Sequence, residues 1–148
     1  HRLQMPTVIW GFSMGGLTAA DIATKRPDLV EGAVLHSSGL VELDLKTTFQ
    51  NASKRPEEKK PEIHTIVSPF DPVVLGVILS GQAGLHLRNE QALNRMGYLH
   101  KTHVVNVLDH ETSEDSLWKS ASLLRKMLPK PKERENSIPE FYQDLCAG

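Results

Sequence analysis

The chain has 148 residues, of which 39% are hydrophobic and 24% are charged, and its formal net charge is -1. These values are typical of one ordinary soluble domain with a reasonable core. They argue against nucleic acid or an anionic membrane surface as the main partner, because nothing supplies a broad basic field. The chain has no apolar run of about 18 residues, so no membrane span is expected. The N-terminus shows no signal-peptide pattern. The single cysteine, Cys146, cannot form an internal disulfide, so cysteine usage does not indicate the cellular compartment of the protein.

The first predicted element is a strand at Thr7–Trp10, a continuous apolar run of the kind that is buried in a parallel sheet. It leads directly into the sequence GFSMGG at residues 11–16, and a helical pattern follows. This is a G-x-S-x-G elbow in the context of strand, turn and helix that such an elbow requires. The tight turn is expected to strain the backbone of Ser13 and to expose its hydroxyl.

The glycines of this elbow have a steric explanation. The residues two before and two after Ser13 are expected to lack a Cβ so that the chain segments can pass one another. Gly11 and Gly15 occupy these two positions, and Gly16 is a third glycine. The backbone N–H of Met14 opens the helix and is expected to point to where an oxyanion would form.

The helix after the elbow is expected to end at residues 25–27, where Lys-Arg-Pro combines basic residues with a proline. The next predicted strand is Gly32–His36, which completes a right-handed strand-helix-strand unit. A short helix is expected within Val41–Ala52, and Ser53–Glu62 is typical of a charged, solvated connector. The segment between the strand Gly32–His36 and the strand Ile63–Val67 is too short for a large helical lid.

Two further predicted strands are each followed by a residue with a titratable side chain. The strand Ile63–Val67 leads to Asp71, and the strand Thr102–Leu108 leads to His110. Residues just beyond the carboxyl ends of parallel strands are where open α/β sheets place their chemistry. The sequence therefore predicts that Asp71 and His110 lie at the same edge of the sheet as the elbow.

Helical patterns fill the remaining part of the chain up to residue 128. Val73–Gly97 is mostly helical in pattern, with a break marked by Gly81 and Gly84. Ser113–Leu128 is predicted as an amphipathic helix with Ser113 as its cap. The fold class expected from this order is α/β, a parallel sheet of about four strands with crossover helices.

Residues 129–148 form a Pro/Lys/Glu-rich tail, in which Ile138–Leu145 is expected to be a short docking helix. Residues 1–128 are therefore expected to form the folded domain, and 129–148 a C-terminal tail. No metal-ligand spacing is visible in the sequence.

The order of serine, aspartate and histidine, each after a strand, resembles the C-terminal half of the α/β-hydrolase fold, from the nucleophile elbow onward. The resemblance covers about Thr7 to Leu128. The motifs that carry it are GFSMGG at 11–16, PDLV at 27–30, SPFDPVV at 68–74 and LDHE at 108–111.

The resemblance implies a catalytic triad whose chemistry needs each of the three groups. Ser13 would be the nucleophile, because a hydroxyl becomes reactive when a base takes its proton. His110 would be that general base and acid, since histidine titrates near neutrality. Asp71 would orient the imidazole and stabilise its charged form, and the Met14 amide would be one oxyanion donor. Such chemistry requires no cofactor.

Each assignment has an alternative. Asp71 precedes Pro72 and could also be a helix cap, although we favour the catalytic role, and Asp44 or Glu42 after the preceding strand is the fallback for the acid. His110 competes with six other histidines, of which two are expected in or at the end of strands (His36, His64), three in or near helix (His86, His100, His103) and one at the terminus (His1). A glycine commonly precedes the histidine in the family, whereas Asp109 does so in this chain.

The resemblance also implies about four further strands before the elbow and a second oxyanion donor among them. The strand at Thr7–Trp10 would otherwise leave an apolar edge open. We therefore expect the chain to be part of a longer hydrolase or to pair with a separate chain that completes the sheet.

The expected function is a serine hydrolase that cleaves a carboxylic ester or thioester of small size through an acyl-enzyme. The alternative is a catalytically inactive hydrolase-like scaffold within a larger assembly, since fold does not fix function. The sequence does not identify the substrate.

Overall fold

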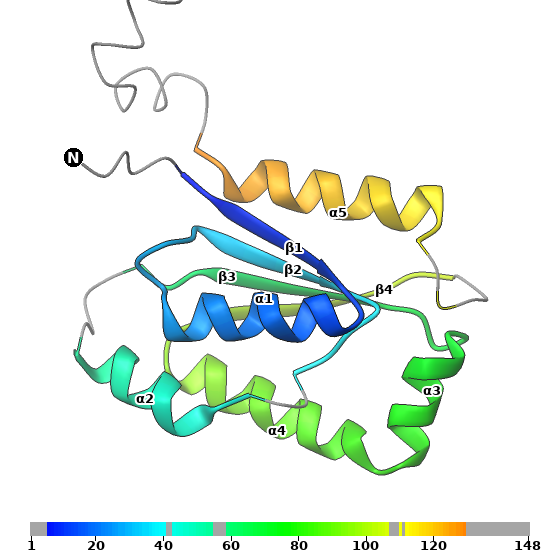
Figure 1. Cartoon of the computed structure of the whole chain (residues 1–148), viewed down its shortest axis with the longest axis horizontal. Coiled ribbons are helices and arrows are strands. Elements are labelled where there is room, and N and C mark those ends of the chain that lie inside the picture. The colour runs from blue at the N-terminus through cyan, green and yellow to red at the C-terminus, as the bar shows by residue number, and fades with distance from the viewer. Residues whose placement is uncertain (1–5, 41–42, 55–58, 107–109, 111, 130–148) are drawn as a thin grey trace, which may run out of the picture.

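A computed structural model of the chain describes residues 6–40, 43–54, 59–106, 110 and 112–129. Within these ranges, β1 (Val8–Phe12), β2 (Gly32–His36), β3 (Glu62–Val67) and β4 (Leu99–Val104) form one sheet in the order β1-β2-β3-β4 (Figure 1). All neighbouring strands are parallel, with Val8 opposite Gly32, Gly32 opposite Glu62 and Glu62 opposite Leu99. The predicted α/β class with a four-stranded parallel sheet is confirmed.

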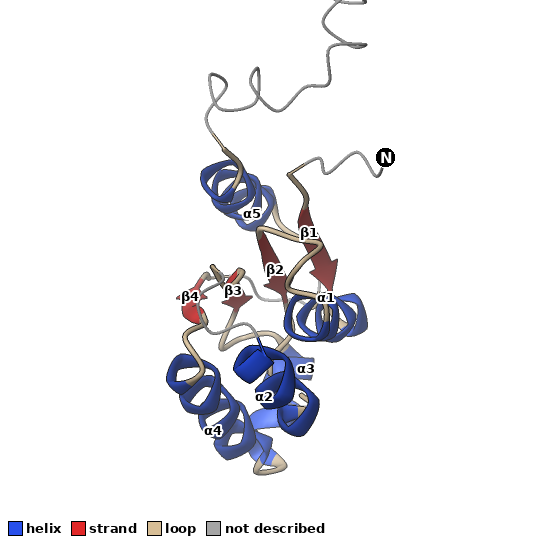
Figure 2. Cartoon of the chain, turned by 90° about the vertical axis from the view of Figure 1, so that its left-hand side faces the viewer, coloured by secondary structure: helices blue, strands red, loops and turns tan. Residues whose placement is uncertain are grey.

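Helices cover both faces of this sheet. They are α1 (Met14–Lys25), α2 (Leu45–Lys54), α3 (Pro72–Leu79), α4 (Gln82–Arg95) and α5 (Glu114–Met127). Figure 2 shows α5 on one face, with α1, α2 and α4 on the other. The helix α3 lies near the carboxyl ends of the strands, beyond the sheet (Figure 1). None of the helices in the described ranges is both long and apolar enough to cross a membrane.

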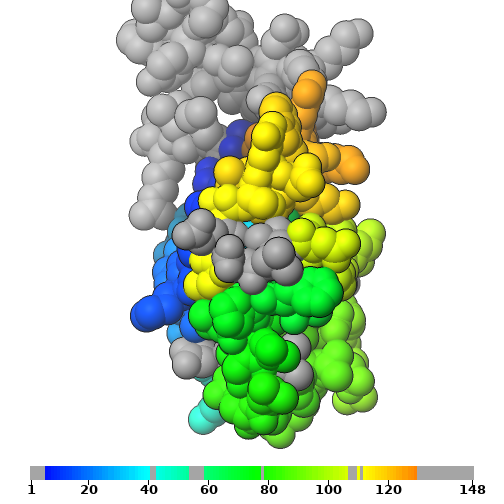
Figure 3. Space-filling view, turned by 90° about the vertical axis from the view of Figure 1, so that its right-hand side faces the viewer, coloured from blue at the N-terminus to red at the C-terminus, as the bar shows by residue number. Residues whose placement is uncertain are grey.

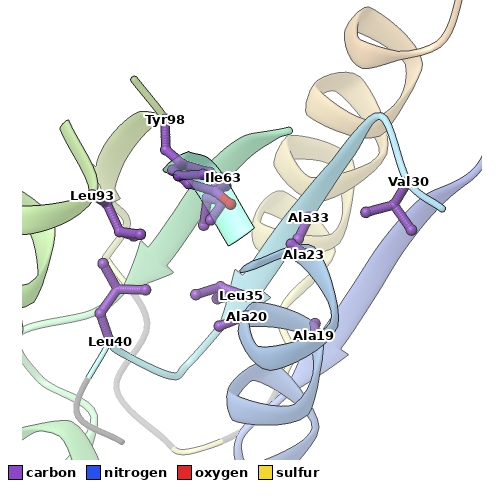
Figure 4. Packing of buried hydrophobic residues seen from close by; sticks show 11 residues of the cluster. Ala19, Ala20, Ala23, Val30, Ala33, Leu35, Leu40, Ile63, Leu93 and Tyr98 are labelled. Atoms are coloured by element: carbon purple, nitrogen blue, oxygen red, sulfur yellow. The ribbon is translucent and has the colours of Figure 1, made fainter. Parts of the chain in front are cut away.

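The larger core lies between the sheet and the helices α1, α2 and α4. Three alanines of α1, at positions 19, 20 and 23, face Ala33 and Leu35 of β2 (Figure 4). These small residues let the helix approach the sheet closely, and Leu35 is fully buried. Complete burial of a leucine contributes roughly 1.5–3 kcal/mol. Alternate residues of the strands face the opposite side, where Val34 and Ile66 pack against α5.

The bounds of the last helix, α5, are determined by residues at its own two ends. The Ser113 hydroxyl accepts a hydrogen bond from the Ser116 amide at 3.2 Å, so the predicted cap is confirmed. Acidic residues occupy the first turn of α5 and basic residues its last turn, and both interact favourably with the helix dipole and stabilise the helix. This helix therefore begins and ends close to its predicted bounds.

The fourth strand differs from its prediction at Thr102–Leu108. It runs from Leu99 to Val104, so His100 and His103, expected in or near helix, lie in a strand. The sequence predicts this strand but places its start three residues too late, because β4 has exposed polar positions and lacks the continuous apolar run of β2. Gly97, with φ of 86°, is the signal that separates α4 from β4.

Smaller differences concern three other elements. β1 continues through Gly11 to Phe12, beyond the predicted end of the strand. The helical break falls at Gly81, which has φ of 82°, whereas Gly84 lies inside α4. The helix expected within Val41–Ala52 begins at Leu45, and Asp44 precedes it. The predicted tail helix at Ile138–Leu145 lies outside the described residues.

Candidate active site

The elbow places Ser13 between the last residue of β1 and the first residue of α1. Its backbone has φ of 52° and ψ of -121°, a conformation that is strained for a residue with a side chain. Two backbone hydrogen bonds hold this turn: the Ser13 amide donates to the His36 carbonyl at 2.8 Å, and the Gly16 amide donates to the Ser13 carbonyl at 2.9 Å. The expected strained turn is therefore present at this serine.

The steric explanation for the glycines needs a correction. A Cβ at Gly11 would overlap the backbone of Gly15, and a Cβ at Gly16 would overlap the side chain of Ser38. A Cβ at Gly15 would meet nothing within 4 Å. The expectation was wrong for Gly15, because this residue is on the exposed side of the first turn of α1, whereas Gly16 faces the residues after β2. Close packing thus requires Gly11, which lies against the backbone of Gly15, and Gly16, which lies against the side chain of Ser38.

The structure brings Ser13, Asp71 and His110 together. His110 Nε2 lies 2.9 Å from Ser13 Oγ, and His110 Nδ1 lies 2.7 Å from Asp71 Oδ2. Because a carboxylate can only accept, the Nδ1–H of His110 donates to Asp71, and Nε2 is left to accept from the serine hydroxyl. We call these three side chains the Ser13 network. They come from the ends of β1 and β3 and from residue 110, which precedes α5.

Asp71 is both a helix cap and a partner of the histidine. Its Oδ1 accepts from the amides of Val73 at 2.8 Å and Val74 at 3.2 Å, while its Oδ2 accepts from His110. The side chain is fully buried, and burial raises the pKa of Asp71. The hydrogen bonds from His110 and from the two amides outweigh burial, so the pKa lies below its ordinary value of 3.8. The two alternatives for Asp71 are compatible, because each oxygen has its own partners.

Two aromatic side chains beside the Ser13 network were not predicted from the sequence. The Phe12 ring packs against the His110 ring with centroids 5.1 Å apart, and it lies edge-on to the His36 ring at 5.7 Å. His36 is buried, its Nδ1 lies 3.3 Å from the Ser120 hydroxyl, and burial lowers its pKa. Phe12 is the variable residue before the elbow serine, a position where the G-x-S-x-G pattern specifies no side chain.

The histidines that competed with His110 have other partners. His64 and His103 contact each other across β3 and β4, with Nδ1 of the first 3.0 Å from Nε2 of the second. His86 accepts from the Leu40 amide at 3.0 Å. Asp44, the alternative acid, accepts from the Thr47 amide at 3.1 Å at the start of α2. Glu42 and Asp109 lie outside the described residues, as do His1 and Cys146.

His100 is the centre of a second network, which we call the Thr65 network. Its Nε2 lies 2.8 Å from Thr65 Oγ1, and its Nδ1 lies 2.9 Å from Glu90 Oε1. The His100 side chain has no exposed surface. Burial lowers its pKa below 6.5, although the hydrogen bond that His100 donates to Glu90 acts in the opposite direction. The lowered pKa favours the neutral form of His100, in which Nδ1–H donates to Glu90 and Nε2 accepts from the Thr65 hydroxyl.

A pocket of about 650 Å³ opens beside Ser13 at the carboxyl ends of the strands. Its walls are the residues after β1 and β2, the end of β3, and the helices α3 and α4. Most of the wall is aliphatic, with Met14, Leu17, Val67, Val73, Val74, Val77, Ala83 and Leu87. Figure 3 faces this end of the sheet, with α3 and α4 in green below and α5 in yellow and orange above.

The described residues contain no group of three or more His, Cys, Asp or Glu side chains that could hold a metal ion. Met14 begins α1, and the first amides of a helix have no carbonyl partner within that helix. The site thus combines a serine at a strained turn, a histidine bonded to a buried carboxylate, and a helix N-terminus, all beside an apolar pocket. These are the components of nucleophilic attack on a carbonyl carbon.

No family model matches the chain, and no curated protein matches its sequence. Solved structures do match it. Arabidopsis thaliana SOBER1 is 25% identical with a TM-score of 0.56, and the match covers 82% of this chain and 53% of SOBER1. Esterase PE8 is 24% identical with a TM-score of 0.58, and the match covers 82% of this chain and 50% of the esterase.

A third match, MGS-M1, is an α/β-hydrolase enzyme from a deep-sea metagenome library, with 18% identity and a TM-score of 0.51. It covers 81% of this chain and 53% of MGS-M1. The chain spans about half the length of the structures that it matches. Together with the four parallel strands and their crossover helices, these matches show that the chain has the α/β-hydrolase fold.

Proposed function

We propose that the chain carries the catalytic residues of a serine hydrolase that cleaves a carboxylic ester or thioester. The observation that supports this proposal best is the Ser13 network, in which one histidine bonds to both the elbow serine and a buried carboxylate. Esterase PE8 supports it further, because its name assigns ester hydrolysis to a protein of the same fold.

In the proposed mechanism, Ser13 Oγ attacks the carbonyl carbon while His110 Nε2 takes the hydroxyl proton. Asp71 holds the Nδ1–H tautomer of His110 and stabilises the imidazolium that forms. The oxyanion of the tetrahedral intermediate accepts from the Met14 amide. His110 then gives its proton to the departing alcohol or thiol, which leaves an acyl group on Ser13. Water attacks this acyl-enzyme with His110 again as base, and the acid is released.

We also propose that additional strands pair with the free side of β1. Among the described residues β1 pairs with β2 alone, and Trp10 on β1 is 39% exposed. Every residue of β2 is buried, whereas β1 has one buried residue. The additional strands belong to a longer polypeptide or to a second chain. The intact mass of the natural protein decides between these sources, because a mass near 16.5 kDa excludes a longer polypeptide.

The test of catalysis is labelling of the complete natural protein with a fluorophosphonate probe, which reacts with an activated serine. We expect the wild type to be labelled and Ser13→Ala and His110→Ala to remain unlabelled. Ser53→Ala is the matched control, because Ser53 lies exposed in α2 and should leave labelling unchanged. A wild type that folds correctly, as judged by circular dichroism, and is not labelled would favour the inactive scaffold.

A further inference from the structure

The lining of the pocket includes a polar patch that the proposed mechanism does not use. It consists of His86 and Glu90 from α4 and Thr102 from β4. The Glu90 side chain retains 24% of its exposed surface, whereas its partner His100 is fully buried. The pocket therefore places a partly accessible carboxylate among apolar groups.

Glu90 is held firmly by the Thr65 network. His100 donates to Oε1, and Thr65 in turn fixes the other nitrogen of that histidine. Because one Glu90 oxygen is used by His100, the other remains available to a ligand in the pocket. A carboxylate positioned in this way accepts a hydrogen bond without losing much side-chain entropy on binding.

Among the described residues, no lysine or arginine forms an ion pair with Glu90. His86 Nδ1 accepts from the Leu40 amide, so that nitrogen carries no proton. Burial lowers the pKa of both His86 and His100, which disfavours a positive charge on either ring. In the part of the chain that the structure describes, the ion pairs of lysine and arginine involve other carboxylates: Asp21, Asp28 and Glu31. A carboxylate beside apolar surface that pairs with no lysine or arginine in the described part of the chain favours a cationic ligand.

We infer that Glu90 is a specificity-determining residue, and that the pocket takes an acyl group that ends in a cationic amine. The aliphatic wall binds the methylene groups of that acyl chain, and Glu90 accepts a charge-assisted hydrogen bond from its ammonium group. This inference rests on the proposed function, since it takes the pocket beside Ser13 as the acyl site.

The test compares kcat/KM for nitrophenyl esters of butyrate, hexanoate and octanoate with their ω-amino and ω-carboxy counterparts, using the complete natural protein. At the best chain length we expect the ω-amino ester to exceed the alkyl ester by about tenfold or more, the range of a charge-assisted hydrogen bond. The ω-carboxy ester should be the poorest substrate, because its charge repels Glu90.

Glu90→Gln is the diagnostic variant, because glutamine can still accept from His100 and retains the shape of the side chain. The ratio of kcat/KM for the ω-amino ester to kcat/KM for the alkyl ester, both measured on the same variant, should fall by about tenfold or more. Asp21→Asn is the matched control: it removes an exposed carboxylate that pairs with Lys25 on α1, and it should leave the preference intact.

Failure of this inference is distinguishable from failure of the proposed function. A wild type that hydrolyses alkyl and ω-amino esters equally well, with full fluorophosphonate labelling, overturns the role of Glu90 and leaves the serine hydrolase standing. A preference that survives in Glu90→Gln also overturns it. Loss of hydrolysis with every ester, together with absent labelling, overturns the proposed function and this inference together.

Discussion

The molecule contains two networks of the same composition, each with a hydroxyl, a histidine and a carboxylate. In the Ser13 network the histidine lies 2.9 Å from the hydroxyl and 2.7 Å from the carboxylate. In the Thr65 network the corresponding distances are 2.8 and 2.9 Å. These distances are so similar that hydrogen-bond length alone does not distinguish a catalytic network from a purely structural one.

The surroundings of the two hydroxyls differ much more than the distances. Ser13 occupies a strained turn at the start of a helix and lines the pocket. Thr65 lies within β3 and is fully buried. A carbonyl group can therefore reach Ser13 and find the first amides of α1 beside it, whereas Thr65 is closed to substrate. Reactivity depends on access and on an oxyanion donor as much as on the hydrogen-bonded chain.

The strongest test of this comparison removes the hydroxyl from each network in turn. Ser13→Ala should lower kcat by about 10⁴ to 10⁶, because the nucleophile is lost. Thr65→Val should stay within about tenfold of wild type, since it replaces a buried hydroxyl by a methyl group of similar shape. The measurement is kcat with an alkyl nitrophenyl ester, with fluorophosphonate labelling as a second readout. An equal loss in both variants would contradict the comparison.

A second test changes the carboxylates. Asp71→Asn should lower kcat by about 10⁴, because asparagine cannot hold His110 in the tautomer that accepts the Ser13 proton. Asparagine is as good a helix cap as aspartate, so α3 should remain folded. Glu90→Gln with the same alkyl ester is the matched change in the other network, and its rate should stay close to wild type. Thermal unfolding of both variants checks that the folds are intact.

The elbow could be predicted from the sequence because its parts are adjacent in the chain. A strand, three glycines, a serine and a helix follow one another within residues 7–25, and each leaves a local signal. The positions of Asp71 and His110 could be predicted because each follows a strand, and parallel strands end at one edge of the sheet. The hydrogen bonds that join them are visible only in the structure.

The Thr65 network could not be predicted, because nothing in the chain indicates that Thr65 and His100 are neighbours. They meet only because β3 and β4 pair in one particular register, with Thr65 opposite Thr102. The sequence also suggested helix around His100, since the exposed positions of β4 interrupt its strand pattern. The aromatic contact between Phe12 and His110 depends in the same way on long-range packing.

A third test concerns the tight turn that holds Ser13, because the Thr65 network has no such turn. It compares the stability of two glycine variants of this turn. Gly11→Ala should lower the free energy of unfolding by about 2 to 4 kcal/mol, because its Cβ would overlap the backbone of Gly15 and the backbone must shift. Gly15→Ala should raise it by about 0.5 to 1 kcal/mol, since the new Cβ meets open space in the first turn of a helix. Urea unfolding of both variants measures the difference. Equal destabilisation would contradict the steric explanation.

The smallest expected effect is a pH dependence of stability that arises from the Thr65 network. Burial holds the pKa of His100 below its ordinary value of 6.5, so the unfolded chain binds a proton more readily than the folded one. The stabilisation is present in full above pH 6.5 and is lost as the pH falls through the folded-state pKa. His100→Gln removes this titrating group and should make the free energy of unfolding depend less steeply on pH below 6.5.

Part of the pH dependence should survive in His100→Gln, because burial lowers the pKa of His36, His64, His86 and His103 in the same direction. The comparison is therefore between slopes: the variant can be less stable at every pH and still show the smaller slope. Urea unfolding above and below pH 6.5 supplies both slopes. Identical slopes would mean that His100 is protonated equally in the folded and unfolded states, which would remove the argument that burial disfavours a positive charge on His100 beside Glu90.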